Sequence, residues 1–241
     1  MSVTDEQERL TEVYGERARR LPADYYSPFH PGNLFILQGR ERALLRMLSR
    51  AGLNDLSERQ ILDLGCGTGS DLRRLLDLGA RPENLHGVDL LAERLEHARA
   101  LSPQLHFELA DAQALPFEDE TFDLVMQSTA FSSILDPEIR LRVADELLRV
   151  LKPGGVVLWY DMRLTNPRNL DLVPMTSREI ARLFAACERD LEAVTLLPPL
   201  ARRLAPVSWG LCAFLEALPV LRSHYVGFFR KPTQEGPLVR A

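Results

Sequence analysis

The chain has 241 residues, of which 46% are hydrophobic and 26% are charged, with 29 Lys and Arg against 34 Asp and Glu. This composition is that of a globular protein and excludes collagen-like, intrinsically disordered and disulfide-scaffold chains. The net charge of −5 argues against a broad nucleic-acid-binding face, which is usually strongly basic. The length predicts one large domain with an appendage, and such a chain can bury a core without disulfide or metal staples.

The cysteines and the first residues bear on the compartment. Cys66, Cys187 and Cys212 are widely spaced and form no CxxC pair, which predicts a reduced protein without a structural zinc or other metal site. The opening MSVTDEQERL is acidic and polar, so we expect no signal peptide. Together these features favour a cytoplasmic protein.

The first 52 residues are expected to be helical. An apolar stripe precedes Gly52, and it consists of Ala43, Leu44, Met47, Leu48 and Ala51. The segment YYSPFHPGN at 25–33 interrupts the pattern, because its prolines disfavour a regular helix there. We therefore expect residues 1–52 to form an N-terminal helical lid or cap, followed by the main domain at 53–241.

The middle of the chain alternates between two patterns. Short apolar runs predict strands at 60–64, 84–88, 105–109, 122–127 and 155–161. Between them lie stretches with helical spacing, such as Leu72, Leu75 and Leu76. This alternation predicts an α/β fold in which a doubly wound parallel sheet has helices on both faces.

After residue 165 we expect a helix from Ser177 to Glu188, a strand near 191–197 and a last strand at 224–230. The insert at about 198–221 is apolar, but it is broken by prolines and carries Glu216. It leaves too few residues for a bilayer-spanning helix, which needs about 20. No integral membrane segment is therefore expected.

The most specific motif is ILDLGCGTG at 61–69. Gly65, Gly67 and Gly69 lie between a strand ending at Leu64 and a helix beginning near Ser70, so the backbone can turn tightly and approach a ligand. The spacing GxGxG differs from the dinucleotide pattern GxGxxG, and no GK[ST] of a phosphate loop follows. The alternative is a purely structural strand–turn–helix corner.

Acidic residues follow the next two strands. Asp89 ends the second strand and is placed to accept hydrogen bonds from both hydroxyls of a ribose, although it can also cap the next helix. Asp111 lies just beyond the third strand, where the alternative is a solvated loop acid. In a doubly wound sheet these loops meet at the carboxyl edge, where ligands bind.

Four motifs in order resemble class I S-adenosylmethionine (SAM)-dependent methyltransferases of the small-molecule, type 11-like kind: ILDLGCGTG, GVDL, DAQALPFEDETFDLV and LLRVLKPGGVVLWYD. The resemblance covers about 60–165 and implies a Rossmann-like, seven-stranded sheet whose last strand, with 224–230 as the candidate, is antiparallel. It also implies SAM as the cofactor, with S-adenosylhomocysteine as its product.

The resemblance assigns cofactor contacts residue by residue. Asp63 and the glycine loop would border the methionine part, Asp89 with Leu90 would hold the ribose, and Asp111 with Ala112 would meet the adenine. Gln127 would lie near the methionine end. The full set of expected cofactor residues is Asp63, Gly65, Cys66, Gly67, Thr68, Gly69, Asp89, Leu90, Asp111, Ala112 and Gln127.

No universal catalytic residue comes with the resemblance. We predict His30 and Asp161 as candidate catalytic groups, since a general base can assist methylation of a hydroxyl. The predicted acceptor contacts are Tyr26, Phe131, Arg163, Asn166 and Arg168. For all of these the alternatives are core packing, loop capping or surface charge.

The leading hypothesis is an enzyme that transfers a methyl group from SAM to a small-molecule acceptor, by O-methylation in specialised metabolism or in a glycan or lipid pathway. One alternative is a SAM-binding regulatory or partner subunit without turnover. An NAD-dependent oxidoreductase is disfavoured by the GxGxG spacing and by LKPGG. The insert at 198–221 is expected to shape the acceptor pocket or a homodimer interface, with a membrane-surface contact as a further alternative.

Overall fold

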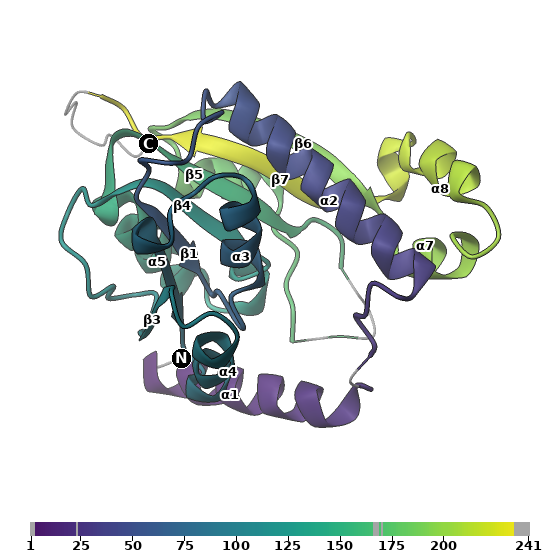
Figure 1. Cartoon of the computed structure of the whole chain (residues 1–241), viewed down its shortest axis with the longest axis horizontal. Helices are drawn as coiled ribbons and strands as arrows, with labels where there is room; N and C mark the ends of the chain where they lie inside the picture. Colours follow the sequence, from purple (N-terminus) through teal and green to yellow (C-terminus); the bar gives the residue numbers. More distant parts are fainter. Residues whose placement is uncertain (1–2, 23, 166–168, 170, 234–241) are drawn as a thin grey trace.

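The computed structural model describes residues 3–22, 24–165, 169 and 171–233. Seven strands in this part of the chain form one sheet in the order β3-β2-β1-β4-β5-β7-β6 (Figure 1). Their bounds are β1 (Ile61–Leu64), β2 (Leu85–Asp89), β3 (His106–Leu109), β4 (Phe122–Ser128), β5 (Leu151–Met162), β6 (Glu188–Leu196) and β7 (Arg222–Arg230). The strands β1 to β5 pair in parallel, whereas β7 runs antiparallel to both β5 and β6. The predicted fold, including its antiparallel last strand, is confirmed.

The sheet reverses its strand order at β1. Leu64 at the end of β1 is paired with Val88 of β2 on one side and with Gln127 of β4 on the other. The crevice outside the carboxyl ends of β1 and β4 is therefore the topological switch point, where sheets of this kind bind ligands.

Helices cover both faces of the sheet. Their bounds are α1 (Val3–Arg20), α2 (Pro31–Arg50), α3 (Ser70–Asp77), α4 (Ala92–Leu101), α5 (Pro137–Val150), α6 (Ser177–Leu183), α7 (Pro198–Leu204) and α8 (Trp209–Glu216). One core contains Ile61 together with residues of α2, α3 and α4, and the other contains Leu62 together with residues of α5 and α6. Adjacent strand residues thus face opposite layers, as the two-residue period of a strand requires.

Three predicted boundaries were wrong. The helix from Ser177 ends at Leu183, and β6 begins at Glu188, because that residue already pairs with Arg230 of β7. The strand β5 begins at Leu151 rather than at 155, because Leu151 pairs with Phe122. The connection at 25–33 is shorter than expected: α2 starts at Pro31, since a proline in the first turn lacks only an N–H that the helix does not use.

The predicted N-terminal region divides into two parts with different surroundings. Figure 1 shows α1 along one end of the molecule, beside α4 and the end of β3. In contrast, α2 packs against the sheet, and its Met47 is completely buried in the same core as Ile61. The division between a lid and a main domain at residue 52 stays a prediction.

Residues 198–221 form a projection that we call the arm: α7, α8 and the 3-10 helix η3 (Pro219–Leu221). It extends from the end of the sheet beside the first turns of α2 (Figure 1). A small separate core at its base contains Phe35, Leu196 and Cys212. A Cβ atom on Gly32 of α2 would lie 2.3 Å from the Cα atom of Arg202, so the backbones of α2 and α7 are in direct contact. None of the helices in the described residues combines the length and apolar character that crossing a membrane requires.

Candidate ligand site at the carboxyl edge of the sheet

A cavity of about 430 Å³ lies at the switch point, beneath α1. Its volume is within the range of small-molecule sites. Its walls come from the loops after four strands and from one face of α1. The strand loops contribute Gly65, Asp89, Leu90, Asp111, Ala112, Ser128 and Thr129. The loops that the sequence placed together are therefore together in the structure.

The glycine loop reaches the cavity with its backbone. Gly65, Gly67 and Gly69 have φ angles of 70°, 55° and 76°, which L side chains rarely adopt. Gly65 lines the cavity, and a Cβ on it would lie 3.4 Å from that of Ala130. A Cβ on Gly69 would lie 2.7 Å from the ring of Phe107. The glycines thus allow both the close approach to a ligand and the packing behind it.

Asp89 holds this loop and also faces the cavity. One carboxylate oxygen accepts a hydrogen bond from the backbone N–H of Gly67 at 2.8 Å, and the other accepts from that of Leu91 at 2.9 Å. The residue is only 7% exposed. Each carboxylate oxygen has two lone-pair sites, so both can accept a further hydrogen bond from a ligand. Asp89 does not cap α4, whose N-cap residue is Leu91, so the helix-cap alternative is wrong, and ligand binding by Asp89 stays a prediction.

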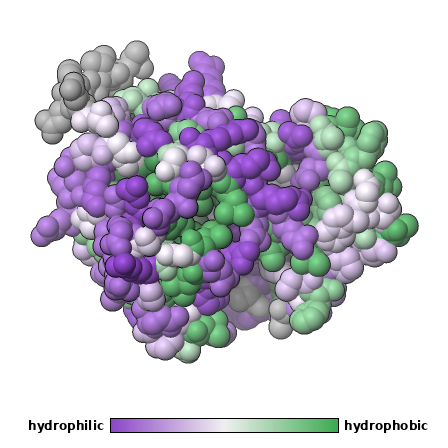
Figure 2. Space-filling model, turned by 45° about the horizontal axis from the view of Figure 1, so that its top comes forward, coloured by the Kyte–Doolittle hydropathy of each residue, from purple (hydrophilic) through white to green (hydrophobic). Residues whose placement is uncertain are grey.

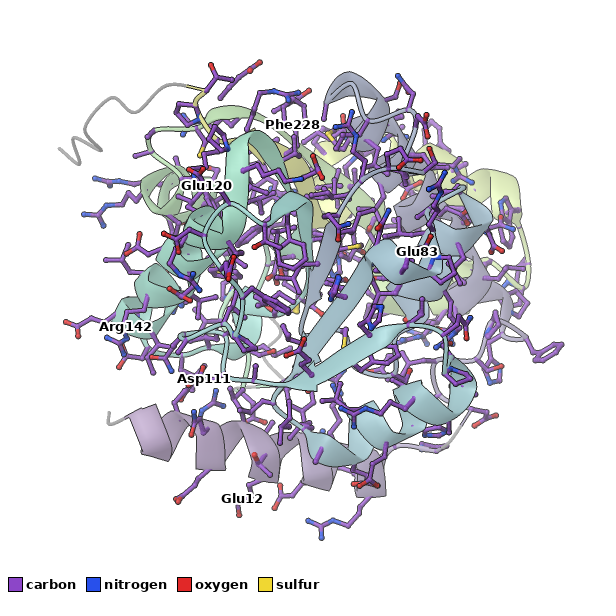
Figure 3. All side chains as sticks on the ribbon, turned by 60° about the vertical axis from the view of Figure 1, so that its left-hand side comes forward. Glu12, Glu83, Asp111, Glu120, Arg142 and Phe228 are labelled. Atoms are coloured by element: carbon purple, nitrogen blue, oxygen red, sulfur yellow. The ribbon has the colours of Figure 1, made fainter. Side chains whose placement is uncertain are left out.

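Asp111 joins the sheet to α1. Its carboxylate accepts hydrogen bonds from the backbone N–H of Gln113 and from the side-chain amide of Gln7 on α1. In Figure 3, Asp111 lies at the end of its strand close to α1, whereas Glu12 points away from the sheet on the opposite side of the helix. One face of α1 therefore closes the cavity and the other faces solvent.

Further contacts fix α1 over the cavity. The buried carboxylate of Glu6 accepts from the backbone N–H of Leu135 at 2.9 Å. The hydroxyl groups of Tyr14 and Ser133 are 2.7 Å apart, and the guanidinium of Arg94 lies 4.4 Å from the centre of the Tyr14 ring. The cavity-facing residues of α1 are Glu6, Gln7, Leu10, Tyr14 and Arg17. Sequence reasoning missed them, although their spacing of three and four residues marks one helix face.

A buried polar cluster lies on the α2 face of the sheet. Arg40 of α2 forms a two-pronged ion pair with Asp71 of α3 and donates to the hydroxyl of Ser128 at 2.9 Å. Its guanidinium also lies 5.0 Å from the centre of the Tyr160 ring, whose pKa burial raises to about 12. Arg40 therefore links α2 to the helix that follows the glycine loop.

Asp63 is almost completely buried in the same region. Burial, and then the nearby carboxylates of Asp71 and Asp89, raise the pKa of Asp63 well above its ordinary value, against the opposing charge of Arg40. The groups around Asp63 carry more negative than positive charge, and one of them, Asp89, lines the cavity.

The predicted catalytic and acceptor residues lie in different places. Asp161 is fully buried and accepts from the backbone N–H groups of Ser132 and Met162, and burial raises its pKa to about 6. Phe131 is also fully buried, with its ring 4.8 Å from that of Trp159. Neither belongs to the cavity wall. Their geometry is that of residues that support the loop after β4.

His30 and Tyr26 lie on the segment before α2. His30 is exposed and pairs with Asp24 at 3.2 Å, outside the cavity wall. Tyr26 lines the cavity, and its hydroxyl accepts from Arg17. Arg163 donates to the backbone carbonyl of Pro219 at 2.8 Å, outside the cavity wall. Asn166 and Arg168 lie outside the described residues, and the roles of the others in catalysis stay predictions.

Six of the predicted cofactor residues do not line the cavity: Asp63, Cys66, Gly67, Thr68, Gly69 and Gln127. The thiol of Cys66 packs in the core, and burial raises its pKa. The carbonyl oxygen of Thr68 accepts from Arg73, and Gln127 accepts from the backbone N–H of Ala130. The contacts of Thr68 and Gln127 hold the loops after β1 and β4.

Comparison with known proteins agrees with this geometry. Residues 61–155 match the family described as a methyltransferase domain. The matched segment contains the glycine loop, Asp89 and Asp111, and the fold is the doubly wound sheet described above. Residues 61–155 are thus similar to a methyltransferase domain, and they lie in a doubly wound sheet.

Two relatives illustrate the match. A phthiotriol/phenolphthiotriol dimycocerosates methyltransferase of Mycobacterium ulcerans is 38% identical over 117 residues, covering 46% of this chain and 41% of that protein. A sterol 4-C-methyltransferase of Caenorhabditis elegans is 34% identical over 124 residues, covering 48% of this chain and 35% of that protein. The first curated relatives are matched over only 20% to 53% of their length.

Among solved structures, the [4+2]-cyclase SpnF is similar with a TM-score of 0.59 and 22% identity, and 82% of each chain is covered. At this identity the likeness shows the fold alone. The same fold therefore occurs in a protein named for a different reaction, so the reaction has to be argued from the site.

Proposed function

We propose that this chain binds SAM in the cavity beneath α1 and transfers its methyl group to a small-molecule acceptor. The observation that carries the proposal is the position of Asp89, which holds the glycine loop through Gly67 and lines the cavity. With Asp111 in the loop after the neighbouring strand β3, it offers carboxylates for a ribose and for the amino group of a base. A nucleoside fits this set of acceptors at a switch point.

The charge of the site supports a cationic cofactor. Asp63 is buried beside the carboxylates of Asp71 and Asp89, and only Arg40 opposes them in the cluster around it. A positively charged sulfonium and ammonium group would lower the cost of keeping Asp63 ionised. NAD has no such positive sulfur centre, and its pyrophosphate would add negative charge to the site.

When bound, SAM supplies an activated methyl group, so the protein has to orient the acceptor and exclude water. Leu10 and Tyr14 of α1 cover the cavity, and Gln7 fixes this helix to Asp111. Asp161 positions the loop after β4 through its hydrogen bond with the N–H of Ser132. In this proposal orientation carries most of the catalysis, and a direct role for His30 or Asp161 as a base is secondary.

The acceptor is proposed to be an apolar molecule that is methylated on oxygen. Tyr26, Ser128, Thr129 and Arg17 are among the residues that line the cavity, and side chains of these types can hydrogen-bond a hydroxyl on the acceptor. Relatives named for a sterol and for dimycocerosates favour a lipid pathway. A glycan or a specialised metabolite is the other class of acceptor within this proposal.

Calorimetry with SAM, S-adenosylhomocysteine and NAD tests the cofactor. We expect SAM to bind, and Asp89→Ala to weaken binding by about 1–3 kcal/mol, because the ligand hydroxyls lose a charged partner. Asp77→Ala is the matched control, since Asp77 lies at the exposed end of α3 and is absent from the cavity wall. Tight NAD binding without SAM binding would indicate an oxidoreductase instead.

Turnover is tested with SAM that carries a ¹³C-labelled methyl group and a panel of sterols, hydroxylated lipids, glycans and phenols. Mass spectrometry should detect a product in which one methyl group replaces a hydrogen. The ¹³C chemical shift then shows whether the methyl group is bonded to oxygen, nitrogen or carbon. SAM binding without any product across the panel would favour the non-catalytic, SAM-binding alternative.

A further inference from the structure

The arm at 198–221 is attached firmly at its base. Phe35 of α2 is buried with Ala201 and Cys212, and its ring lies 5.1 Å from that of Trp209. The side-chain carbonyl of Asn33 accepts a hydrogen bond from Arg202 at 2.9 Å. Since the base is packed and hydrogen-bonded, the arm is a fixed part of the fold rather than a loose loop.

The outer side of the arm is strongly apolar. Its large exposed side chains, with their exposed fractions, are Val207 (84%), Val220 (74%), Phe214 (67%), Leu211 (42%), Leu218 (42%) and Trp209 (38%). We call these six residues the apolar tip. Figure 2 shows hydrophobic residues gathered on the projecting lobe that contains α7 and α8. Scattered apolar side chains are normal on a protein surface, but a gathered set indicates an interaction site.

The charged residues of the arm and its flanks are mostly basic. From Ala193 to Arg222 the chain carries Arg202, Arg203 and Arg222, and Glu216 is its single acidic residue. The Glu216 carboxylate accepts a hydrogen bond from the backbone N–H of Leu196 at 3.2 Å, so it is turned toward the base of the arm. In a chain with a net charge of −5, this end is therefore locally basic.

Apolar side chains bordered by arginine and aromatic residues are typical of proteins that lie on a membrane surface. The guanidinium of Arg202 lies 4.6 Å from the centre of the Tyr25 ring, and Phe29 in the same segment is 95% exposed. We propose that the arm docks on the surface of an anionic lipid bilayer, with the apolar tip in the headgroup region and the arginines near the phosphates.

A second copy of the chain fits this surface less well. In a symmetric dimer the same patch meets itself, so Arg202 and Arg203 of both copies would come together without acidic partners from the arm. A stable dimer also needs about 800 Å² of buried surface per partner. This is a large area for two helices of 7 and 8 residues to supply. A bilayer supplies both the apolar layer and the opposite charge.

Docking goes beyond the proposed function and does not require it. No residue of the arm lines the cavity, whereas Tyr26, which does, adjoins Tyr25 with ring centres 4.8 Å apart. The segment that carries both tyrosines contacts the arm through Arg202. If the proposed transfer acts on a lipid, docking would bring the cavity to the surface that holds the acceptor.

The test is vesicle flotation of the full chain with phosphatidylcholine vesicles, with and without phosphatidylglycerol. We expect binding to the anionic vesicles that weakens as salt increases. The double variant Phe214→Ser/Val220→Ser should lower the partition coefficient about tenfold or more, because two exposed apolar side chains are lost. Leu101→Ser is the matched control: Leu101 ends α4, is 53% exposed and lies away from the arm, so binding should be unchanged.

Two further measurements separate the possible results. Of the two tryptophans, Trp159 is buried and Trp209 is exposed on the arm, so quenching of fluorescence by brominated acyl chains reports on Trp209. Arg203→Glu should weaken binding to anionic vesicles only. SAM binding by each variant, measured by calorimetry, should equal that of the wild type, which separates loss of docking from loss of the cofactor site.

Three results would overturn the docking proposal. The first is a wild-type chain that does not float with anionic vesicles at low salt. The second is undiminished flotation of Phe214→Ser/Val220→Ser. The third is self-association in analytical ultracentrifugation that this double variant abolishes, without vesicle binding by the wild type, which would assign the tip to a second copy of the chain.

Discussion

The hydroxyl group of Tyr14 lies 2.7 Å from the hydroxyl group of Ser133, and this contact joins α1 to the loop that follows β4. The same helix reaches the loop after β3 through Gln7 and Asp111. Because α1 lies over the cavity, these contacts hold part of the cavity's cover in place.

Replacing Tyr14 with phenylalanine removes one of the contacts while keeping the ring under Arg94. A hydrogen bond of this kind contributes about 1 kcal/mol, so we expect both association and dissociation of SAM to become about fivefold faster. The dissociation constant should change little, since the contact is lost in the free and bound states alike. Stopped-flow fluorescence measures both rates. Glu12→Gln on the solvent side of α1 is the control, and unchanged rates in Tyr14→Phe would show that α1 does not gate the cavity.

The raised pKa of Asp63 predicts that SAM affinity depends on pH. The pKa of Asp63 is raised by burial and by the carboxylates of Asp71 and Asp89, so the group becomes protonated at a higher pH than an ordinary aspartate. A cationic ligand favours the ionised form, so affinity should fall as pH falls through that raised pKa and binding should release a proton. Calorimetry in buffers of different ionisation enthalpy detects the proton.

Asp63→Asn should remove most of this pH dependence. Its affinity for SAM should resemble that of the wild type at low pH, because the asparagine is neutral throughout. S-adenosylhomocysteine, which lacks the sulfonium charge, should show a weaker dependence with the wild type. Equal pH profiles for Asp63→Asn and the wild type would exclude Asp63 as the source.

His224 predicts how stability responds to acid. Its ring stacks on that of Tyr160 at 4.7 Å, its Nδ1 atom lies 2.8 Å from the hydroxyl of Ser223, and burial and then Arg40 lower its pKa to about 4. The unfolded chain binds a proton at about pH 6.5, so stability is lost as pH falls from about 6.5 to about 4. Over this interval the free energy of unfolding, measured with urea, should fall by about 3 kcal/mol less for His224→Gln than for the wild type.

Asp161 has the opposite effect on the free energy of unfolding as pH falls. Its pKa is about 6 in the folded chain, so the folded state takes up a proton before the unfolded state does, and acidification from pH 6 to 4 stabilises the fold. Asp161→Asn removes that gain. Between these pH values the free energy of unfolding of this variant should therefore fall by about 3 kcal/mol more than that of the wild type. If both variants follow the wild-type profile, these groups do not govern the response to acid.

Gly32 predicts the effect of separating α2 from α7. A methyl group there would lie 2.3 Å from the Cα atom of Arg202 and 2.8 Å from the carbonyl oxygen of Ala201, and neither backbone atom can move alone. We expect Gly32→Ala to destabilise the chain by about 1–3 kcal/mol through overpacking. Gly15→Ala is the control, because a Cβ at that position would meet no atom within 4 Å apart from the nearby backbone of its own helix. Chemical denaturation compares the two, and equal stabilities would contradict the close packing.

The glycine loop, Asp89 and Asp111 could be predicted because each lies at the end of a strand or just after it, and the topology brings these strand ends together. The contacts of Gln7 and Tyr14 could not, since they depend on where α1 lies in space and not on any local pattern. Arg40 was missed for the same reason: its partner Asp71 is 31 residues away, and an arginine on an amphipathic helix is expected to face solvent.

The end of α6 shows a different limit. Residues after Leu183 have the apolar content of a helix, but Glu188 to Asp190 pair with β7 instead. Tertiary pairing with a strand more than thirty residues later decided the boundary, and local propensity is too weak to oppose it. Phe131 was likewise expected at a pocket wall. Its ring instead packs against the indole of Trp159 in the core.

The helix α2 is one continuous element that contacts both the arm and α3. It has 20 residues, which makes it about 30 Å long. Gly32 in its first turn contacts the arm, and Arg40 near its middle forms an ion pair with Asp71 at the start of α3. Because the helix is uninterrupted, a tilt of its first turn would also move the turns that follow. One continuous helix therefore connects the arm with the helix that begins where the glycine loop ends.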